Sequence, residues 1–206
     1  MKKKIGLFIA IIAWIAVVAQ YNLMIENRVA TVLETTIRFF SFFTILTNTI
    51  VAIYFTSITF KNKNDLFVAE SKMGTLTAVT VYITLVGLIY QIVLRQLWQP
   101  TGLQRLVDEL LHTIIPILVI VFWYLYGDKA ASKYNNIPKW LIYPLAYLAY
   151  ILIRGNFSGF YPYPFVNVNQ LGLQKVLVNS VGLIVLFAVL SSIFIRVGRA
   201  IKTDKG

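Results

Sequence analysis

Six long apolar stretches divide the chain, and short polar segments separate them. A helix needs about 20 mostly apolar residues to cross the hydrocarbon core of a bilayer. We place the spans at Ile5–Met24, Phe39–Phe60, Met73–Leu94, Leu110–Gly127, Pro138–Ile153 and Gly172–Ile195. The fifth is the weakest, because it is short and contains Pro144. The pattern predicts an all-α, polytopic membrane protein with six transmembrane helices in a single domain, residues 1–206.

The basic residues predict the direction in which these helices cross. Thirteen of them flank the spans on the side of both termini, and six lie on the opposite side. The first set contains eleven of the twelve lysines, and the second contains five of the seven arginines. Because cytoplasmic loops carry the excess of Lys and Arg, we place the N- and C-termini in the cytoplasm and the protein in the cell membrane.

The amino-terminal segment has a second interpretation. Three lysines, Lys2 to Lys4, precede an apolar run from Ile5 to Ala19, which also fits a secretory signal peptide. No small-residue cleavage site follows this run. We therefore interpret the segment as a retained first span.

Composition narrows the classes of function. Hydrophobic residues make up 58% of the chain and charged residues 13%, about half the charged fraction of a soluble domain. The net charge of +11 does not favour nucleic-acid binding, because the basic residues lie in short runs between apolar stretches. The lack of cysteine excludes disulfides and thiolate metal sites, and the single histidine excludes sites with several imidazoles. We expect no metal, no cofactor and no nucleic-acid partner.

Polar side chains are costly in hydrocarbon, and so they tend to face the interior of a helix bundle. One face of the second span carries a polar stripe formed by Arg38, Ser41, Thr44 and Asn48, with Thr47 beside it. The outer end of the third span carries Gln91 and Arg95. These groups lie in the same half of the predicted bundle.

The polar group that points most specifically to chemistry lies at the start of the fourth span. Asp108 and Glu109 lie four and three residues before His112, so either carboxylate can reach the imidazole from the preceding turn. Thr101–Gln104 resembles a capping box that starts this helix before the membrane. Pro116 crowds the carbonyl of the residue four positions earlier, which is His112, and so it predicts a bend there.

The connection between the fifth and sixth spans, residues 154–171, is rich in Gly, Pro and aromatic residues. We expect it to be irregular and to fold back over the outer mouth of the bundle, as a substrate gate or as an interfacial anchor. It supplies further candidate residues, namely Arg154, Tyr161, Tyr163, Phe165 and Asn167.

These outer polar groups allow two interpretations. They form a functional cavity, or they join helices, as Ser, Thr, Asn and Gln often do in membranes. The outer arginines likewise contact lipid headgroups or an anionic substrate. If the cavity is functional, the candidate substrate-binding residues are Arg38, Gln91, Arg95, Arg154, Tyr161, Tyr163 and Phe165.

Three short motifs resemble a known family. They are Phe40–Asn48 (FSFFTILTN), Leu111–Pro116 (LHTIIP) and Tyr161–Phe165 (YPYPF) before the last span. In span order they are similar to the bacterial six-span "Pr-six-Pr" integral membrane family. They resemble more distantly the eukaryotic androgen-induced and androgen-dependent TFPI-regulating proteins. Those eukaryotic proteins are intramembrane hydrolases of fatty acid esters of hydroxy fatty acids, with a threonine nucleophile and a histidine.

The resemblance implies Thr44 as nucleophile and His112 as base. The eukaryotic pattern has an acidic residue three positions after its threonine, where this chain has Thr47, which is the reserve nucleophile. Its histidine precedes the proline by five residues, against four here. Chemically, a neutral imidazole suits the activation of a hydroxyl, and a carboxylate holds its tautomer. Asn48 or Asn167 is the candidate donor to an oxyanion.

The leading hypothesis is a threonine/histidine-dependent hydrolase of lipid esters that acts in an outer-half cavity, with a membrane lipid as its partner. The second is a lipid- or small-molecule-binding membrane protein without catalysis. A transporter is less favoured, because its site should lie near the middle of the bilayer. The sequence does not indicate an oligomeric state.

Overall fold

The computed structural model describes residues 1–60 and 74–203, and in these ranges the chain forms helices and no strand. The helices are α1 (Lys2–Glu26), α2 (Val32–Phe39), α3 (Phe43–Phe60), α5 (Thr75–Ile89), α6 (Gly102–Glu109), α7 (Ile115–Tyr126), α8 (Ile137–Ser158), α9 (Val168–Leu171) and α10 (Leu173–Thr203). Two π-helical turns are η2 (Tyr90–Leu94) and η3 (Leu110–Ile114), and two 3-10 turns are η4 (Tyr134–Asn136) and η5 (Pro164–Val166). The predicted all-α class is confirmed for these residues.

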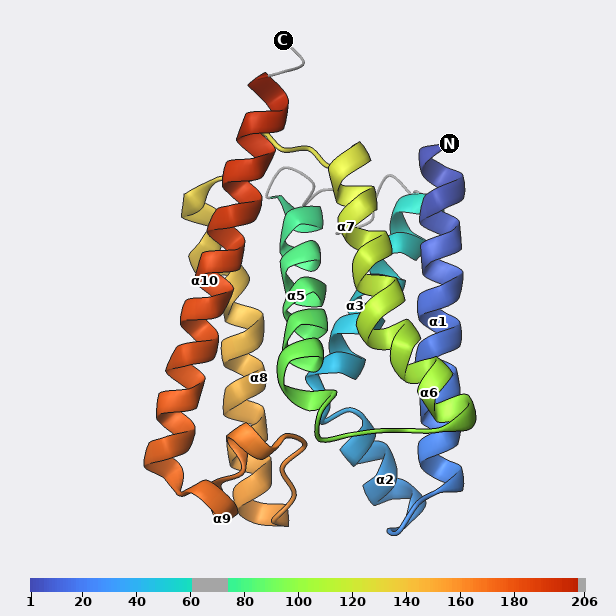
Figure 1. Ribbon diagram of the computed structural model, residues 1–206, viewed down its shortest axis with the longest axis vertical. Coiled ribbons are helices and arrows are strands. Elements are labelled where there is room, and N and C mark those ends of the chain that lie inside the picture. Colours follow the sequence, from blue (N-terminus) through green and yellow to red (C-terminus); the bar gives the residue numbers. More distant parts are fainter. Residues whose placement is uncertain (61–73, 204–206) are drawn as a thin grey trace.

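Several helices have the length and composition that a membrane requires. Within the described ranges, five segments qualify: Lys2–Glu26, Phe43–Phe60, Thr75–Leu94, Gly102–Tyr126 and Leu173–Ile201. They correspond to five of the six predicted spans. The predicted fifth span forms α8, which packs beside α10 but is not among these five (Figure 1). The start of α1 and the end of α10 lie at the same end of the bundle (Figure 1).

The predicted second span is divided into two helices. α2 ends at Phe39, and α3 begins at Phe43. The side chain of Thr31 accepts a hydrogen bond from the Glu34 amide at 3.2 Å and thereby caps α2. α2 is short and lies at the end of the bundle opposite the termini (Figure 1). Arg38 is therefore separated from the rest of the polar stripe, which lies at the turn and on α3.

The other predicted helix boundaries differ less from those of the structure. Met73, predicted to begin the third span, lies outside the described residues, as do Lys61, Lys63 and Lys72 of the basic set. α6 begins one residue after Thr101, as the capping box predicts, but the Thr101 side chain makes no capping hydrogen bond.

The connection after α8 is more regular than predicted. α8 continues to Ser158, and η5 and α9 follow, so residues 154–158 are helical. The segment does fold back against the bundle: Tyr163 is 8% exposed and Val166 is 2% exposed.

Small residues let α1 approach α3 closely. Gly6, Ala10 and Ala13 are buried on α1, at spacings that place them along one side of the helix. A Cβ atom at Gly6 would lie 3.3 Å from Thr59 Oγ1 on α3. Small residues at such contacts are common between helices in membranes, where close backbone packing contributes strongly to association.

The outward faces of the long helices are apolar. On α10 the exposed side chains Val178, Val181, Val185 and Val189 recur every three or four residues. A soluble protein rarely exposes an apolar surface of this extent. The exposed faces therefore agree with helices that contact lipid.

Candidate functional site

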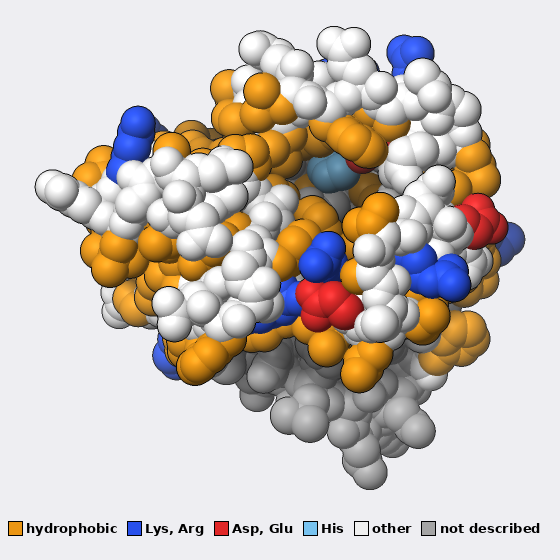
Figure 2. Space-filling view, turned by 90° about the horizontal axis from the view of Figure 1, so that it is seen from below, with side chains coloured by type: hydrophobic (Ala, Val, Ile, Leu, Met, Phe, Trp, Pro, Cys, Tyr) orange, Lys and Arg blue, Asp and Glu red, His pale blue; other side chains and the backbone are white. Residues whose placement is uncertain are grey.

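The only histidine of the chain lies at the floor of a hollow. Figure 2 views the end of the bundle opposite the termini and shows the imidazole inside this hollow. His112 is 9% exposed. Its Nδ1 atom lies 2.9 Å from the backbone oxygen of Asp108 and 3.3 Å from the Asp108 Oδ1 atom. Of the two carboxylates that the sequence offers to the imidazole, Asp108 is the one that contacts it.

These contacts select the tautomer of His112. A backbone oxygen only accepts hydrogen bonds, so the neutral imidazole carries its hydrogen on Nδ1 and its lone pair on Nε2. Within residues 1–60 and 74–203, Nε2 has no hydrogen-bond partner. A donor nitrogen held by a carboxylate and a free lone pair on the other side are the features of an oriented base.

Tyr90 completes this group, and the sequence analysis did not find it. Its ring stacks on the imidazole with centroids 4.1 Å apart and planes 14° apart. Its hydroxyl donates a hydrogen bond to Asp108 Oδ2. The Asp108 carboxylate therefore contacts both rings, and the phenol shields one face of His112. The only sequence signal for Tyr90 was its position beside Gln91.

Two widened helical turns, η2 and η3, present Tyr90 and His112 to each other. Such π-helical turns are rare in proteins, and those that occur often lie at functional sites. The sequence predicted a bend at His112, and the structure shows a π-helical turn there, which ends just before Pro116. The missing N–H and bulky ring of this proline disturb the preceding turn. A Cβ atom at Gly87 would lie 3.2 Å from the His112 carbonyl oxygen. Glycine at this position therefore lets α5 approach η3 closely.

Glu109 faces a different set of partners. It forms an ion pair with Arg95, and it accepts a hydrogen bond from Thr113 Oγ1 at 2.7 Å. Arg95 also donates to Gln91 Oε1 at 2.7 Å, and Gln91 donates to Thr113 at 2.8 Å. The Arg95 guanidinium lies 5.8 Å from the Tyr90 ring centre. These four side chains form a closed network next to the Tyr90–Asp108–His112 group.

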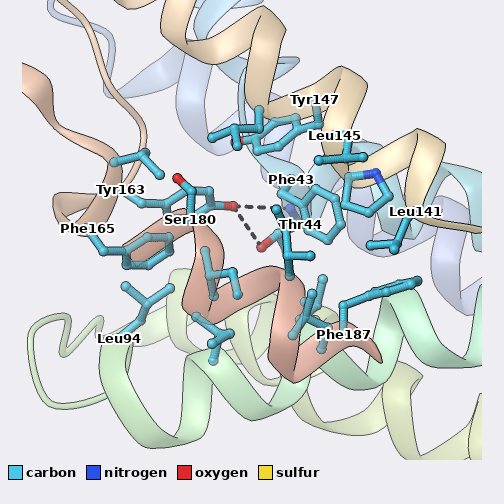
Figure 3. Close-up of a pocket in the computed structure, with 18 residues that line it drawn as sticks. Phe43, Thr44, Leu94, Leu141, Leu145, Tyr147, Tyr163, Phe165, Ser180 and Phe187 are labelled. Carbon is cyan, nitrogen blue, oxygen red and sulfur yellow. Dashed lines mark hydrogen bonds between the residues drawn. The ribbon is translucent and has the colours of Figure 1, made fainter. Parts of the chain in front are cut away.

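Thr44 borders a separate apolar cavity of about 90 Å³ between α3, α5, α8 and α10. Figure 3 shows that its walls are mostly hydrocarbon side chains. The Tyr163 hydroxyl lies 3.3 Å from Thr44 Oγ1 and accepts a hydrogen bond from the Thr44 amide at 3.2 Å (Figure 3). The Phe165 ring stacks on Tyr163 at 5.2 Å. Thr44 is therefore a polar group at the wall of an apolar space.

Ser41, in the turn before α3, and Thr47, on α3, both contact tyrosines of α8. Thr47 Oγ1 lies 2.9 Å from the Tyr143 hydroxyl, and Ser41 Oγ lies 3.3 Å from the Tyr150 hydroxyl. Tyr147 donates to the Ser41 carbonyl oxygen at 2.8 Å. These tyrosines recur after four and three residues, so they lie on one face of α8. The contacts support the helix-joining interpretation for Ser41 and Thr47.

Asn48 lies between the two candidate groups. Its Nδ2 atom donates to the carbonyl oxygens of Thr44 at 2.9 Å and Leu111 at 3.3 Å, while its buried Oδ1 atom has no hydrogen-bond partner among the described residues. Both of its N–H donors are thus engaged. Asn167, the other candidate oxyanion donor, accepts a hydrogen bond from the Gln170 amide at 3.2 Å and caps α9.

Thr44 and His112 belong to adjoining groups. Among the described residues no hydrogen bond joins them, because the hydroxyl faces Tyr163 and the imidazole faces Asp108. Through Asn48, however, the backbone of Thr44 is connected to the residue that precedes His112. The two groups therefore lie on neighbouring turns of α3 and η3.

Two arginines hold residues 159–167, which follow α8 and which we call the covering segment, to α2. Glu34 Oε1 accepts hydrogen bonds from Arg38 and Arg154, both at 2.8 Å. Both guanidinium groups lie against the Phe160 ring, 4.7 Å and 5.0 Å from its centre. The hydrogen bond from Arg38, with the nearby charge of Arg154, lowers the pKa of Glu34 below its usual value of 4.5. Tyr161, another candidate from this segment, packs on Gly155 of α8.

The Glu34 contacts predict a loss of stability in acid. A carboxylate whose pKa is lower in the folded state contributes stability above its unfolded pKa, and this contribution disappears as the pH falls through the folded pKa. We expect the melting temperature of the purified protein to fall below about pH 4.5, and Glu34→Gln to remove part of this dependence. Glu26→Gln, at an exposed residue without an ion pair among the described residues, should leave it unchanged. Identical profiles for wild type and Glu34→Gln would contradict the assignment.

Within the described residues, no three His, Asp or Glu side chains gather as a metal site would require. No protein-family model matches this chain, and no curated protein or solved structure matches it either.

Proposed function

We propose that this protein is an intramembrane hydrolase of lipid esters, with His112 as general base and Thr44 as nucleophile. The observation that carries the proposal is the oriented imidazole: Nδ1 is held by Asp108, and the ring lies in a hollow at the end of the bundle. The apolar cavity beside Thr44 is suited to a hydrocarbon chain, since its walls are mostly Leu, Ile, Val and Phe.

In the proposed reaction His112 Nε2 takes the proton of the Thr44 hydroxyl while Oγ1 attacks the ester carbonyl carbon. The tetrahedral intermediate collapses, the alkoxide of the leaving alcohol takes the proton from the imidazolium, and Thr44 carries the acyl group. The same nitrogen then takes a proton from a water molecule while the water oxygen attacks the acyl carbon. The Thr44 oxygen leaves and takes that proton from the imidazolium, which releases the fatty acid and restores the hydroxyl. These steps require the bound substrate to turn the Thr44 hydroxyl from Tyr163 toward His112. Catalytic hydrogen bonds are often long or poorly aligned until the substrate is bound.

A second candidate function is lipid binding without catalysis. The observation that favours it is the hydrogen bond of Thr44 to Tyr163, which leaves the hydroxyl and the imidazole unconnected. In this case the apolar cavity holds an acyl chain, and the polar groups orient it.

One experiment separates the two candidates. Purified protein in detergent micelles is incubated with long-chain acyl esters and, separately, with a fluorescent fluorophosphonate. The hydrolase proposal expects release of fatty acid, and labelling of wild type but not of Thr44→Ala. Binding of a fluorescent fatty acid without turnover and without labelling would leave the second candidate instead.

We further propose six membrane crossings with both termini in the cytoplasm. In support, α8 packs beside α10 with 22 residues, and the long helices alternate in direction (Figure 1). Because the chain has no cysteine, single introduced cysteines give a clean test. Lys133→Cys should react with an impermeant thiol reagent only after the membrane is opened, whereas Ser158→Cys should react in intact cells. Labelling of both positions from outside would contradict the proposed crossing of α8.

A further inference from the structure

A second polar site lies at the other end of the bundle, near the termini. Where the connection from α7 to η4 meets α10, a pocket of about 400 Å³ is lined by Lys129, Ala130, Ser132, Lys133, Tyr134, Asn135 and Arg199. We call it the basic pocket. Three of these residues are cations, and none of those described is acidic. The adjacent Asp128 accepts hydrogen bonds from the amides of Ala130 and Ala131, at 3.0 and 3.3 Å. The described lining thus carries three cationic side chains.

The cations of the basic pocket are positioned by aromatic residues. Lys129 donates a hydrogen bond to the Tyr124 carbonyl oxygen at 2.6 Å, and its ammonium lies 5.6 Å from the Trp123 ring centre. The Arg199 guanidinium lies 4.7 Å from the centre of the Tyr134 ring. Tyr and Trp are enriched where helices leave the hydrocarbon for the headgroup region. These aromatic residues indicate that the pocket lies at headgroup depth.

The floor of the basic pocket is tied to the bundle. Ser132 is 3% exposed, and its Oγ atom lies 2.7 Å from Thr77 Oγ1 on α5. Trp123 Nε1 donates to the same threonine oxygen at 2.8 Å. A Cβ atom at Gly198 would lie only 3.0 Å from Lys129 Cγ, so this glycine gives the lysine room against α10. The pocket is thus formed by a fixed turn and not by a loose loop.

An apolar groove lies next to the basic pocket. It has a volume of about 340 Å³, and its described lining residues, from α7 and α10, are Ile120, Val121, Trp123, Tyr124, Leu125, Ile193, Phe194 and Val197. Trp123 and Tyr124 line this groove and also contact Lys129 of the basic pocket. A cationic pocket that continues into an apolar groove on the outer face of two membrane helices matches one amphipathic molecule, with an anionic head and a hydrocarbon tail.

We propose that the basic pocket and the adjoining groove bind an anionic phospholipid, with the phosphate against Lys133 and Arg199 and one acyl chain between α7 and α10. Phosphate accepts charge-assisted hydrogen bonds from guanidinium and ammonium groups. Basic pockets between membrane helices on the cytoplasmic side are suited to such headgroups. The site is separate from the His112 hollow and does not depend on the proposed hydrolysis.

The test compares two double variants that remove the same charge from the same end of the molecule. Lys133→Gln/Arg199→Gln changes the pocket, whereas Lys139→Gln/Arg196→Gln changes exposed residues that do not line it. Binding of phosphatidylglycerol and of phosphatidylcholine to each purified protein is measured by native mass spectrometry. Loss of one charge-assisted hydrogen bond weakens binding about 10-fold, so we expect the pocket variant, which loses the contacts of two cations, to bind phosphatidylglycerol at least about 10-fold more weakly. The control should bind it as wild type does.

A further measurement with inorganic phosphate alone distinguishes binding of a lipid from binding of a free anion. The proposal expects wild type to be stabilised by phosphatidylglycerol in a melting experiment and not by phosphate at the same concentration. Equal stabilisation by phosphate would overturn the lipid assignment. Equal affinity of wild type for both lipids, or equal weakening in the two double variants, would overturn the pocket itself and leave only general attraction to an anionic surface.

Discussion

His112→Ala and Thr44→Ala should each abolish ester hydrolysis while the protein stays folded. General-base catalysis typically contributes about 10²- to 10⁴-fold in rate, and loss of a nucleophile removes the covalent route altogether. By contrast, an interhelical hydrogen bond in a membrane contributes only about 0.6 kcal/mol of stability on average. Catalytic and packing roles therefore predict losses of very different size in kcat and in melting temperature.

Thr47→Ala is the matched control for the nucleophile. Thr47 lies one turn from Thr44 on α3, is fully buried, and bonds to Tyr143 of α8. The substitution removes the same hydroxyl and leaves the same methyl-sized side chain, so it should cost some stability and keep most of the activity. If Thr47→Ala and not Thr44→Ala eliminates turnover and fluorophosphonate labelling, Thr47 is the nucleophile. Full activity in His112→Ala would end the proposal for the imidazole.

The histidine group could be predicted from sequence only in part. The spacing of Asp108 and His112 by four residues is a local property of a helix, and the structure bears out their contact. The disturbance before Pro116 is likewise local, because it follows from the missing N–H and the bulk of the ring. Tyr90, however, stacks on the imidazole from another helix. A contact between residues 22 positions apart depends on how two helices meet, which no pattern along one helix specifies.

The polar stripe shows the same limit. Its periodicity correctly indicated that Thr44, Thr47 and Asn48 face the interior, where they are 7% exposed or less. It gave no indication that the partners would be tyrosines of α8 and the covering segment, since tyrosine also fits an interfacial position. The break between α2 and α3 was missed because polar residues recur at helical spacing from Arg38 to Asn48, across the position of the turn. Hydropathy does not distinguish one helix from two that meet at a turn.

Gly155→Ala should destabilise the protein by about 1–3 kcal/mol, the usual cost of overpacking. A Cβ atom at this position would lie 2.1 Å from Cε1 and 2.3 Å from Cζ of Tyr161. The ring rests directly on the backbone of α8, so it must move for the methyl group to fit. Tyr161 is only two residues from Tyr163, which holds Thr44. We therefore also expect weaker closure of the covering segment, measured as faster hydrogen exchange in residues 159–167.

Gly182→Ala is the matched control, because the same substitution is not expected to destabilise the protein at this position. Gly182 lies inside α10, and a Cβ atom there would have no described neighbour within 4 Å. Alanine is favoured over glycine in a helix interior by about 1 kcal/mol, so this variant should melt at the same or a higher temperature. The same helix preference favours alanine at position 155, so the clash with Tyr161 must cost more free energy than this preference contributes. Removing the ring in Gly155→Ala/Tyr161→Ala should therefore cost less than the sum of the two single changes. Strictly additive losses would show that Tyr161 is not what the added methyl group meets.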